Sequence, residues 1–151
     1  MLLNPKELDR LRADPSLLGS AVEELLRYVN PVNNATFRFA GEPLEIGGQQ
    51  ISPDEVVMVS LSGANRDPSR YAGPDRLDLS RDSAGHLAFG HGIHYCLGAP
   101  LARLEAEIAF GGLLERFGSM TLAVPAEDLR WRPSTLIHGL ESLPVRLAPR
   151  G

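Results

Sequence analysis

One stretch, Phe89 to Gly98, decides how the rest of this sequence is interpreted; it reads Phe-Gly-His-Gly-Ile-His-Tyr-Cys-Leu-Gly. Its cysteine, Cys96, is the only one among 151 residues. Cys96 directly precedes a segment with the apolar spacing of a helix. The unpaired N–H groups and the dipole at a helix N-terminus favour the thiolate, which is the form of cysteine that binds metals. Gly90 and Gly92 allow a tight turn and a close approach of the backbone to a flat ligand. The stretch therefore predicts a ligand-binding loop centred on Cys96.

This loop resembles the haem-binding loop of the cytochrome P450 family, F-G-x-G-x-x-x-C-x-G. Every fixed position of that pattern is present, at Phe89, Gly90, Gly92, Cys96 and Gly98. The resemblance implies that Cys96 is the axial ligand of the iron of haem b, iron protoporphyrin IX, and that His94 contacts a haem propionate. In this family the thiolate pushes electron density onto the haem iron. Phe89 is expected to shield the sulfur from water.

The cysteine loop has other interpretations. Cys96 taken alone is most often a small buried hydrophobic residue. The loop could also hold zinc, because histidine and cysteine are common zinc ligands, although the usual matched distal pair is missing. A cysteine nucleophile is disfavoured, because no third orienting group is evident. The residues available for zinc are His86, His91, His94 and Cys96.

Two further segments match the family. Glu24 and Arg27 form an E-x-x-R pair on one helix face, an ordinary surface ion pair if taken alone. The resemblance implies that both join a second arginine from a later loop in a buried structural triad, and Arg76 is expected to be that arginine. Breaking such a buried network is costly. Arg38, which alternates with Phe37 and Phe39 along a strand, resembles the second propionate contact.

Composition limits the possible partners. There are 15 basic and 19 acidic residues, for a net charge of −4, which argues against nucleic-acid binding. No apolar run approaches the length that crosses a bilayer, and no secretory signal is visible, so neither a membrane anchor nor export is expected. The single cysteine excludes internal disulfides. We expect a cytoplasmic protein.

The order of expected elements is helix, short strands, long loop, helix and short strands. It predicts an α+β fold, mainly helical with small β-hairpins, and by resemblance the C-terminal part of the cytochrome P450 fold. Asn4-Pro5 opens a first helix, and a Ser20–Glu23 capping box opens a second that stops at Asn30-Pro31. Asp67-Pro68 is expected to begin a short helix, and the strongest helix spans 97–117, with Gly118 at its C-cap. The expected strands are 36–39, 44–46, 50–51, 56–61, 121–124, 129–131 and 143–147.

The resemblance covers residues 1–151, which are expected to form a single partial domain. The family's N-terminal portion and its central oxygen-activating helix have no counterpart among these residues. The implied activity is that of a haem-thiolate monooxygenase, which inserts one oxygen atom from O2 into a small organic substrate. The alternative is a non-catalytic haem-binding fragment that needs a partner chain.

The resemblance also implies partners and a substrate side. Electrons would come from an external donor, either a ferredoxin or a flavoprotein reductase, because no dinucleotide-binding pattern is present. Arg103 is a candidate contact for that donor. Two stretches, 31–36 and 136–139, are expected to line the distal pocket, where the substrate binds.

Overall fold

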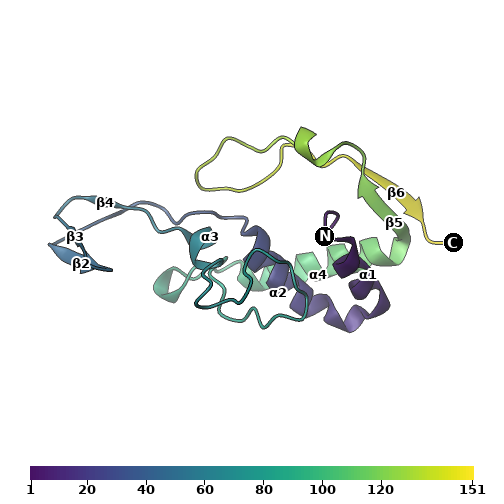
Figure 1. The fold of residues 1–151 in the computed structure, drawn as a ribbon, viewed down its shortest axis with the longest axis horizontal. Helices are drawn as coiled ribbons and strands as arrows, with labels where there is room; N and C mark the ends of the chain where they lie inside the picture. The colour runs from purple at the N-terminus through teal and green to yellow at the C-terminus, as the bar shows by residue number, and fades with distance from the viewer.

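A computed structural model describes residues 1–151, and two helices far apart in the sequence form its centre. They are α2 (Leu18–Val29) and α4 (Ala99–Arg116), and α1 (Pro5–Ala13) packs beside them (Figure 1). The main apolar cluster contains Leu11 of α1 and Ala21 of α2. Leu77 and Leu79, from the long loop before the cysteine stretch, complete it. The α2 helix is therefore covered by both the first helix and the loop that leads to Cys96.

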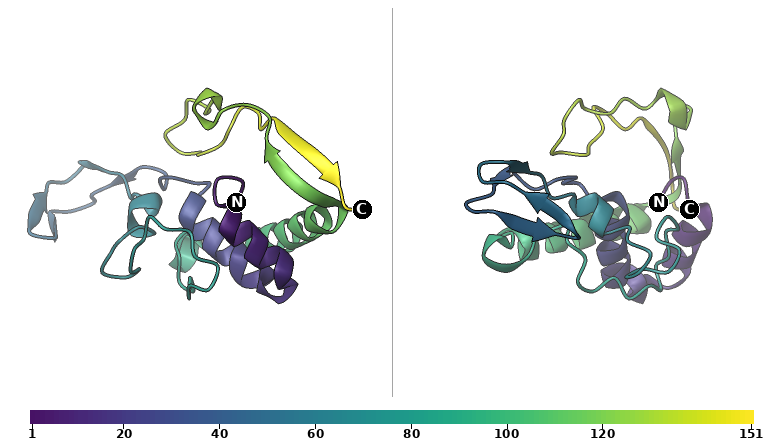
Figure 2. Two further views of the ribbon diagram at one scale, coloured as in Figure 1. Left: turned by 45° about the vertical axis from the view of Figure 1, so that its right-hand side comes forward. Right: turned by 60° about the vertical axis from the view of Figure 1, so that its left-hand side comes forward.

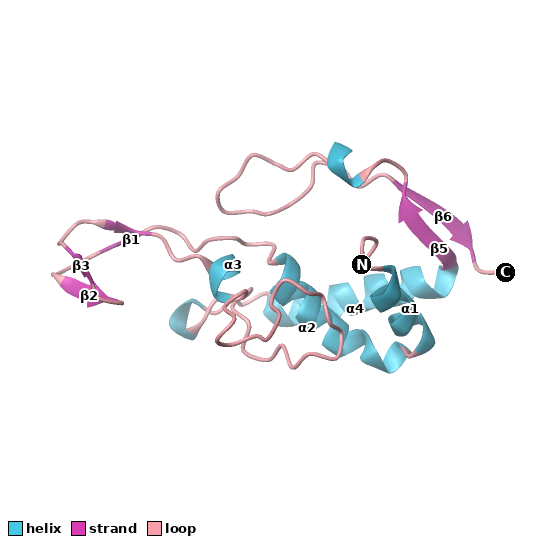
Figure 3. Ribbon diagram, viewed as in Figure 1, coloured by secondary structure: helices cyan, strands magenta, loops and turns pink.

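All strands lie in three small antiparallel sheets, coloured magenta in Figure 3. The β2–β3 hairpin turns at Gly47 and Gly48, whose φ angles of 59° and 83° are the positive values that such a turn requires. This arrangement confirms the α+β class with small hairpins. The pairs are β1 (Arg38–Phe39) with β4 (Val56–Val57), β2 (Leu44–Ile46) with β3 (Gln49–Ile51), and β5 (Phe117–Leu122) with β6 (Val145–Pro149).

Short helical turns connect these elements. A four-residue helix, α3 (Leu61–Ala64), follows β4, and the hydroxyl of Ser60 caps it by accepting a hydrogen bond from the Gly63 amide. Three 3₁₀ turns span Pro15–Leu17, Gly92–His94 and Ala126–Asp128. In the left view of Figure 2, the β2–β3 hairpin and the loop between β5 and β6 extend away from the helices.

Several local predictions were wrong. Ser20 does not cap α2, because a 3₁₀ turn already leads into that helix and Ser20 Oγ donates to the Leu17 carbonyl inside it. Asp67-Pro68 begins turns instead of a helix, and Gly118 lies within β5. The strand expected over 56–61 stops after Val57, since the chain turns into α3. The strand expected over 129–131 is reduced to one isolated bridge between Trp131 and Leu140.

Few residues are buried for a chain of this length, 17 of 151. The outer face of α4 shows why, since Leu101, Leu104 and Ile108 are 53–66% exposed. A domain of this size usually covers such a stripe. No helix has the length and apolar character needed to cross a membrane.

Candidate functional site

The loop around Cys96 is closed by its own backbone. The Cys96 amide donates to the carbonyl of Phe89 at 2.9 Å, which joins the two arms of the loop directly beside the cysteine. Between the arms, the 3₁₀ turn is closed by the Tyr95 amide and the Gly92 carbonyl. The thiol of Cys96 is exposed, and it lies just before α4. The loop thus presents a free thiol on a fixed backbone turn.

Two glycines make room in this loop. Gly90 has φ +74°, and a Cβ placed there would lie 3.3 Å from the carbonyl oxygen of His94. A Cβ at Gly98 would lie 3.7 Å from the sulfur of Cys96, an ordinary contact that would nevertheless cover one side of the sulfur. Gly90 therefore requires glycine for the turn itself, and Gly92, with φ +64°, has a left-handed backbone that favours glycine as well. Gly98 leaves the sulfur open at the start of α4.

The thiol lies on the wall of a cavity of about 610 Å³. This volume lies in the range of small-molecule sites, and 9 of the 15 lining residues are hydrophobic. Arg38 is half-buried on the wall, and only its Nη1 donates within the chain, to Thr36 and to the Phe37 carbonyl. The predicted residues Phe89, Gly90, His94, Cys96 and Arg38 all line this cavity, whereas Gly98 does not.

These residues fit a large, flat, mostly apolar group that carries a metal and acidic substituents. The apolar wall suits the body of the group, the thiol supplies one soft ligand, and Arg38 and His94 supply cationic or polar contacts. They do not fit a zinc ion, because no three His, Cys, Asp or Glu side chains come together to hold a metal. The zinc interpretation of His86, His91, His94 and Cys96 is therefore wrong. His86 is instead buried against Glu23.

A buried ionic network on α2 supports the loop from behind. Glu24 and Arg27 are both 0% exposed, and two hydrogen bonds of 2.7 and 2.8 Å join them. Arg27 also donates to the carbonyls of Asn65 and Pro74, so that its guanidinium crosses from α2 to the long loop. Burial alone would raise the pKa of Glu24, but hydrogen bonds from Arg27, Ser83 and the Asp78 amide outweigh it and hold that pKa below its ordinary value.

The second arginine of the triad is Arg81, and the prediction of Arg76 was wrong. Arg81 Nε lies 3.2 Å from Glu24 Oε1, and its side chain is 10% exposed. The Arg76 side chain is 75% exposed and turns outward to Asp78. Arg76 contributes to the network only through its carbonyl, which accepts from Arg27 and Arg81. The path of the loop brings the later arginine back to α2.

The sequence interpretation missed the role of Asn65. Its side chain accepts from the Leu87 amide at 2.7 Å and donates to Asn30 at 2.8 Å, so it ties the loop before Cys96 to the end of α2. Asn30 itself adopts a left-handed conformation with φ 49°, which asparagine tolerates. The only available signal was the Asn-Arg-Asp-Pro run, which indicates a turn but does not identify its partner.

The two stretches expected at the distal pocket lie side by side. Val32 and Ile137 form an antiparallel bridge, and the Asn33 amide donates to Leu136 at 2.7 Å. The first stretch lines the cavity through Pro31, Val32, Ala35 and Thr36. The second stretch does not reach the cavity wall, and His138 stacks on Trp131 with ring centroids 4.1 Å apart.

An exposed thiol at a mostly apolar cavity, supported by a buried Glu–Arg–Arg network, is the arrangement that the resemblance to haem-thiolate proteins predicts. Comparison with known proteins agrees: the family model described as Cytochrome P450 matches residues 10–130. This chain belongs to the cytochrome P450 family, whose members use iron protoporphyrin IX as cofactor.

Two relatives and one solved structure illustrate the match. Cytochrome P450 107B1 of Saccharopolyspora erythraea is 56% identical over 146 residues, which cover 97% of this chain and 36% of that protein. Cytochrome P450 monooxygenase PikC of Streptomyces venezuelae is 52% identical over 97% of this chain and 35% of its own length. The structure of the tirandamycin C-bound P450 monooxygenase TamI superposes with a TM-score of 0.94 at 57% identity, over 97% of this chain and 37% of that one. The chain thus spans little more than a third of these relatives.

Proposed function

We propose that this chain binds haem b with the Cys96 thiolate as axial ligand of the iron. The observation that carries the proposal is the position of the Cys96 thiol at the wall of a cavity of about 610 Å³ that is mostly apolar. His94 and Arg38 on the same wall are assigned to the haem propionates, because Nε and Nη2 of Arg38 are not used within the chain. We assign to Phe89, on the same cavity wall, the role of shielding the sulfur once haem is bound, and Gly90 gives the loop its turn.

The reaction we propose is that of a haem-thiolate monooxygenase, in which bound haem supplies O2 chemistry and one oxygen atom enters a small organic molecule. The roles of this chain's residues are to hold the cofactor and to exclude water from the proximal sulfur. We assign the electron supply to an external ferredoxin or flavoprotein reductase. The names of two relatives, a monooxygenase and 6-deoxyerythronolide B hydroxylase, support this class of reaction. We also propose that the chain is located in the cytoplasm.

A second candidate is a haem-binding chain that does not turn over without further protein. The exposed apolar face of α4 favours it, because Leu104 and Ile108 are more than half exposed in a helix that contacts α2 on its other side. Covering the haem from the substrate side would also need residues beyond Val32 and its neighbours. Turnover with substrate and an electron donor separates the two candidates.

The deciding experiment is the titration of the purified chain with haem, followed by reduction and addition of carbon monoxide. Thiolate ligation gives the red-shifted Soret band, and Cys96→Ser should abolish that band while haem can still enter the cavity. Phe37→Leu, at an exposed position outside the cavity wall, is the matched control and should leave the band in place. Failure of the wild-type chain to take up haem would overturn the proposal.

A further inference from the structure

Arg103, in the second turn of α4, makes three separate interactions beside the cysteine loop. Its Nε and Nη2 donate to the two carboxylate oxygens of Glu23 at 2.6 and 2.9 Å, a bidentate pair. Its Nη1 donates to the hydroxyl of Tyr95 at 3.0 Å. Its guanidinium also lies 4.6 Å from the ring centroid of Phe89. One side chain therefore contacts both arms of the loop, at Phe89 and at Tyr95.

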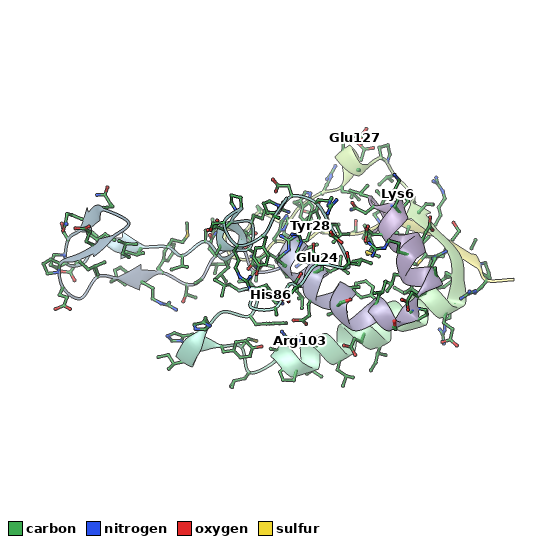
Figure 4. The ribbon with its side chains drawn as sticks, turned by 60° about the horizontal axis from the view of Figure 1, so that its bottom comes forward. Lys6, Glu24, Tyr28, His86, Arg103 and Glu127 are labelled. Atoms are coloured by element: carbon green, nitrogen blue, oxygen red, sulfur yellow. The ribbon has the colours of Figure 1, made fainter.

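Glu23 binds the loop a second time through His86. The Nε2 of His86 lies 3.2 Å from Glu23 Oε2, and its Nδ1 accepts from the Ala88 amide at 3.1 Å. The ring of Phe89 lies between His86 and Tyr95, with centroids 6.0 and 6.4 Å away. Figure 4 labels Glu24, His86 and Arg103, which lie close together where α2 passes α4. One carboxylate on α2 thus organises an arginine and a histidine around the loop.

This arrangement is separate from the buried network of Glu24, Arg27 and Arg81, called the Glu24 network below. Glu24 and Arg27 contact residues of the long loop, Asn65 to Ser83, and neither touches the residues that flank Cys96. The carboxylate of Glu23, the preceding residue on α2, forms side-chain hydrogen bonds with His86 and Arg103 instead. The hydrogen bonds from Arg103 are the main reason that the pKa of Glu23 is held below its ordinary value, and the same contact raises the pKa of Arg103. The pair therefore remains ionised at neutral pH.

We propose that Arg103, oriented by Glu23, is a positioning residue that holds the two arms of the cysteine loop together and so fixes Cys96. The hydrogen bond that it protects is the one between the Cys96 amide and the Phe89 carbonyl, 2.9 Å long, because Arg103 contacts Phe89 itself and Tyr95, the neighbour of Cys96. The consequence for the iron ligand rests on the proposed function; the effect on the loop does not. Since three of its nitrogens bind within the chain, Arg103 is a poor candidate for the contact with an electron donor.

Amide hydrogen exchange on the 151-residue chain tests the positioning role without haem. In Arg103→Gln the amides of Tyr95 and Cys96 should exchange about tenfold faster, the effect expected when hydrogen bonds to a charged group are lost. Amides within α1 serve as the internal reference and should not change. Glu105→Gln, at an exposed position of the same helix, is the matched control. Faster exchange in α1 and in the loop alike would reduce Arg103 to a general stabiliser and overturn the proposal, as would unchanged exchange in the loop.

Further variants test whether Arg103 acts through Glu23. Glu23→Gln should accelerate hydrogen exchange at the same amides. The double variant Glu23→Gln/Arg103→Gln should exchange no faster at these amides than Arg103→Gln alone. Arg103→Lys should recover only part of the protection, because an ammonium cannot bind Glu23 in a bidentate way while also reaching Tyr95. Additive effects of Glu23→Gln and Arg103→Gln would show independent action and contradict the proposed order of contacts.

A spectroscopic arm follows the iron ligand in the haem-loaded chain. Arg103→Gln should convert the thiolate-type carbon monoxide spectrum to the non-thiolate type several-fold faster than wild type, while Glu105→Gln should not. An unchanged spectrum alongside a loosened loop would overturn the consequence for Cys96. If the wild-type chain takes up no haem, the proposed function fails, and the exchange experiment still decides the role of Arg103.

Discussion

The Glu24 network and the outer face of α4 invert the usual distribution of polar and apolar groups. Glu24 and Arg27 are ionised side chains with no exposed surface, whereas Leu101, Leu104 and Ile108 are apolar side chains that are mostly exposed. Every charge of the network is hydrogen-bonded within the chain, so that its burial is compensated. The apolar face has no such partner within residues 1–151. The support behind the cysteine loop is therefore self-contained, while the surface of the following helix is not.

The largest predicted effect comes from breaking the network at its centre. Glu24→Gln keeps the shape of the side chain but removes the negative charge that balances the guanidinium groups of Arg27 and Arg81 in the buried network. The free energy of unfolding should fall by about 3–5 kcal/mol, measured by urea denaturation. Glu42→Gln, at an exposed site without a partner, is the matched control and should change it by less than about 0.5 kcal/mol. Equal effects of the two variants would show that the network does not hold the fold.

A smaller effect distinguishes the two arginines of the long loop. Arg81→Ala removes a charge-assisted hydrogen bond to Glu24 and should lower the free energy of unfolding by about 1.5–3 kcal/mol. Arg76→Ala removes only an exposed pair with Asp78 and keeps the carbonyl that serves the network, so a loss below about 1 kcal/mol is expected. A larger loss of unfolding free energy in Arg76→Ala than in Arg81→Ala would show that Arg76 is the third member of the triad.

These two arginines also show the limit of prediction from the sequence. The fixed positions of the cysteine loop, with Glu24 and Arg27, identified the family, because each depends on residue type at short spacing. Arg76 and Arg81 lie in a segment without periodicity, so only the path of the chain decides which one returns to α2. Glu23 and Arg103 are 80 positions apart, and a local pattern cannot pair such residues. The helical spacing in α4 correctly indicated an apolar stripe, but the same spacing occurs whether or not the stripe is covered.

The third prediction concerns acid sensitivity near the cysteine loop. Burial lowers the pKa of His86 below its ordinary value of 6.5, so the folded state binds a proton there less readily than the unfolded state. The stability that neutral His86 provides is complete above pH 6.5 and is lost as the pH falls below that value. The urea midpoint should therefore drop between pH 7.5 and pH 5.5, and less so in His86→Gln.

The control for this acid effect is His91→Gln, because His91 is exposed in the same loop. The urea midpoint of His91→Gln should fall between pH 7.5 and pH 5.5 by as much as that of the wild-type chain. Below pH 5 a second loss should follow in all variants that keep the carboxylates. Glu23, Glu24 and Asp78 have lowered pKa values, so their contributions are present above the ordinary carboxyl range and disappear as the pH falls through the folded values. An acid profile that is the same in His86→Gln and in wild type would contradict the assignment to His86.

The smallest predicted effect concerns the exposed apolar face of α4. Ile108 is 66% exposed, so Ile108→Ala in the 151-residue chain removes little buried surface and should change the free energy of unfolding by less than about 0.5 kcal/mol. Leu11, at 2% exposure in the apolar cluster, is the buried reference, and Leu11→Ala should remove about 2–5 kcal/mol. If Ile108→Ala instead destabilises nearly as much as Leu11→Ala, the face of α4 must be covered in solution. Sedimentation of the wild-type chain would then decide between a second copy, which gives concentration-dependent mass, and a rearranged monomer, which does not.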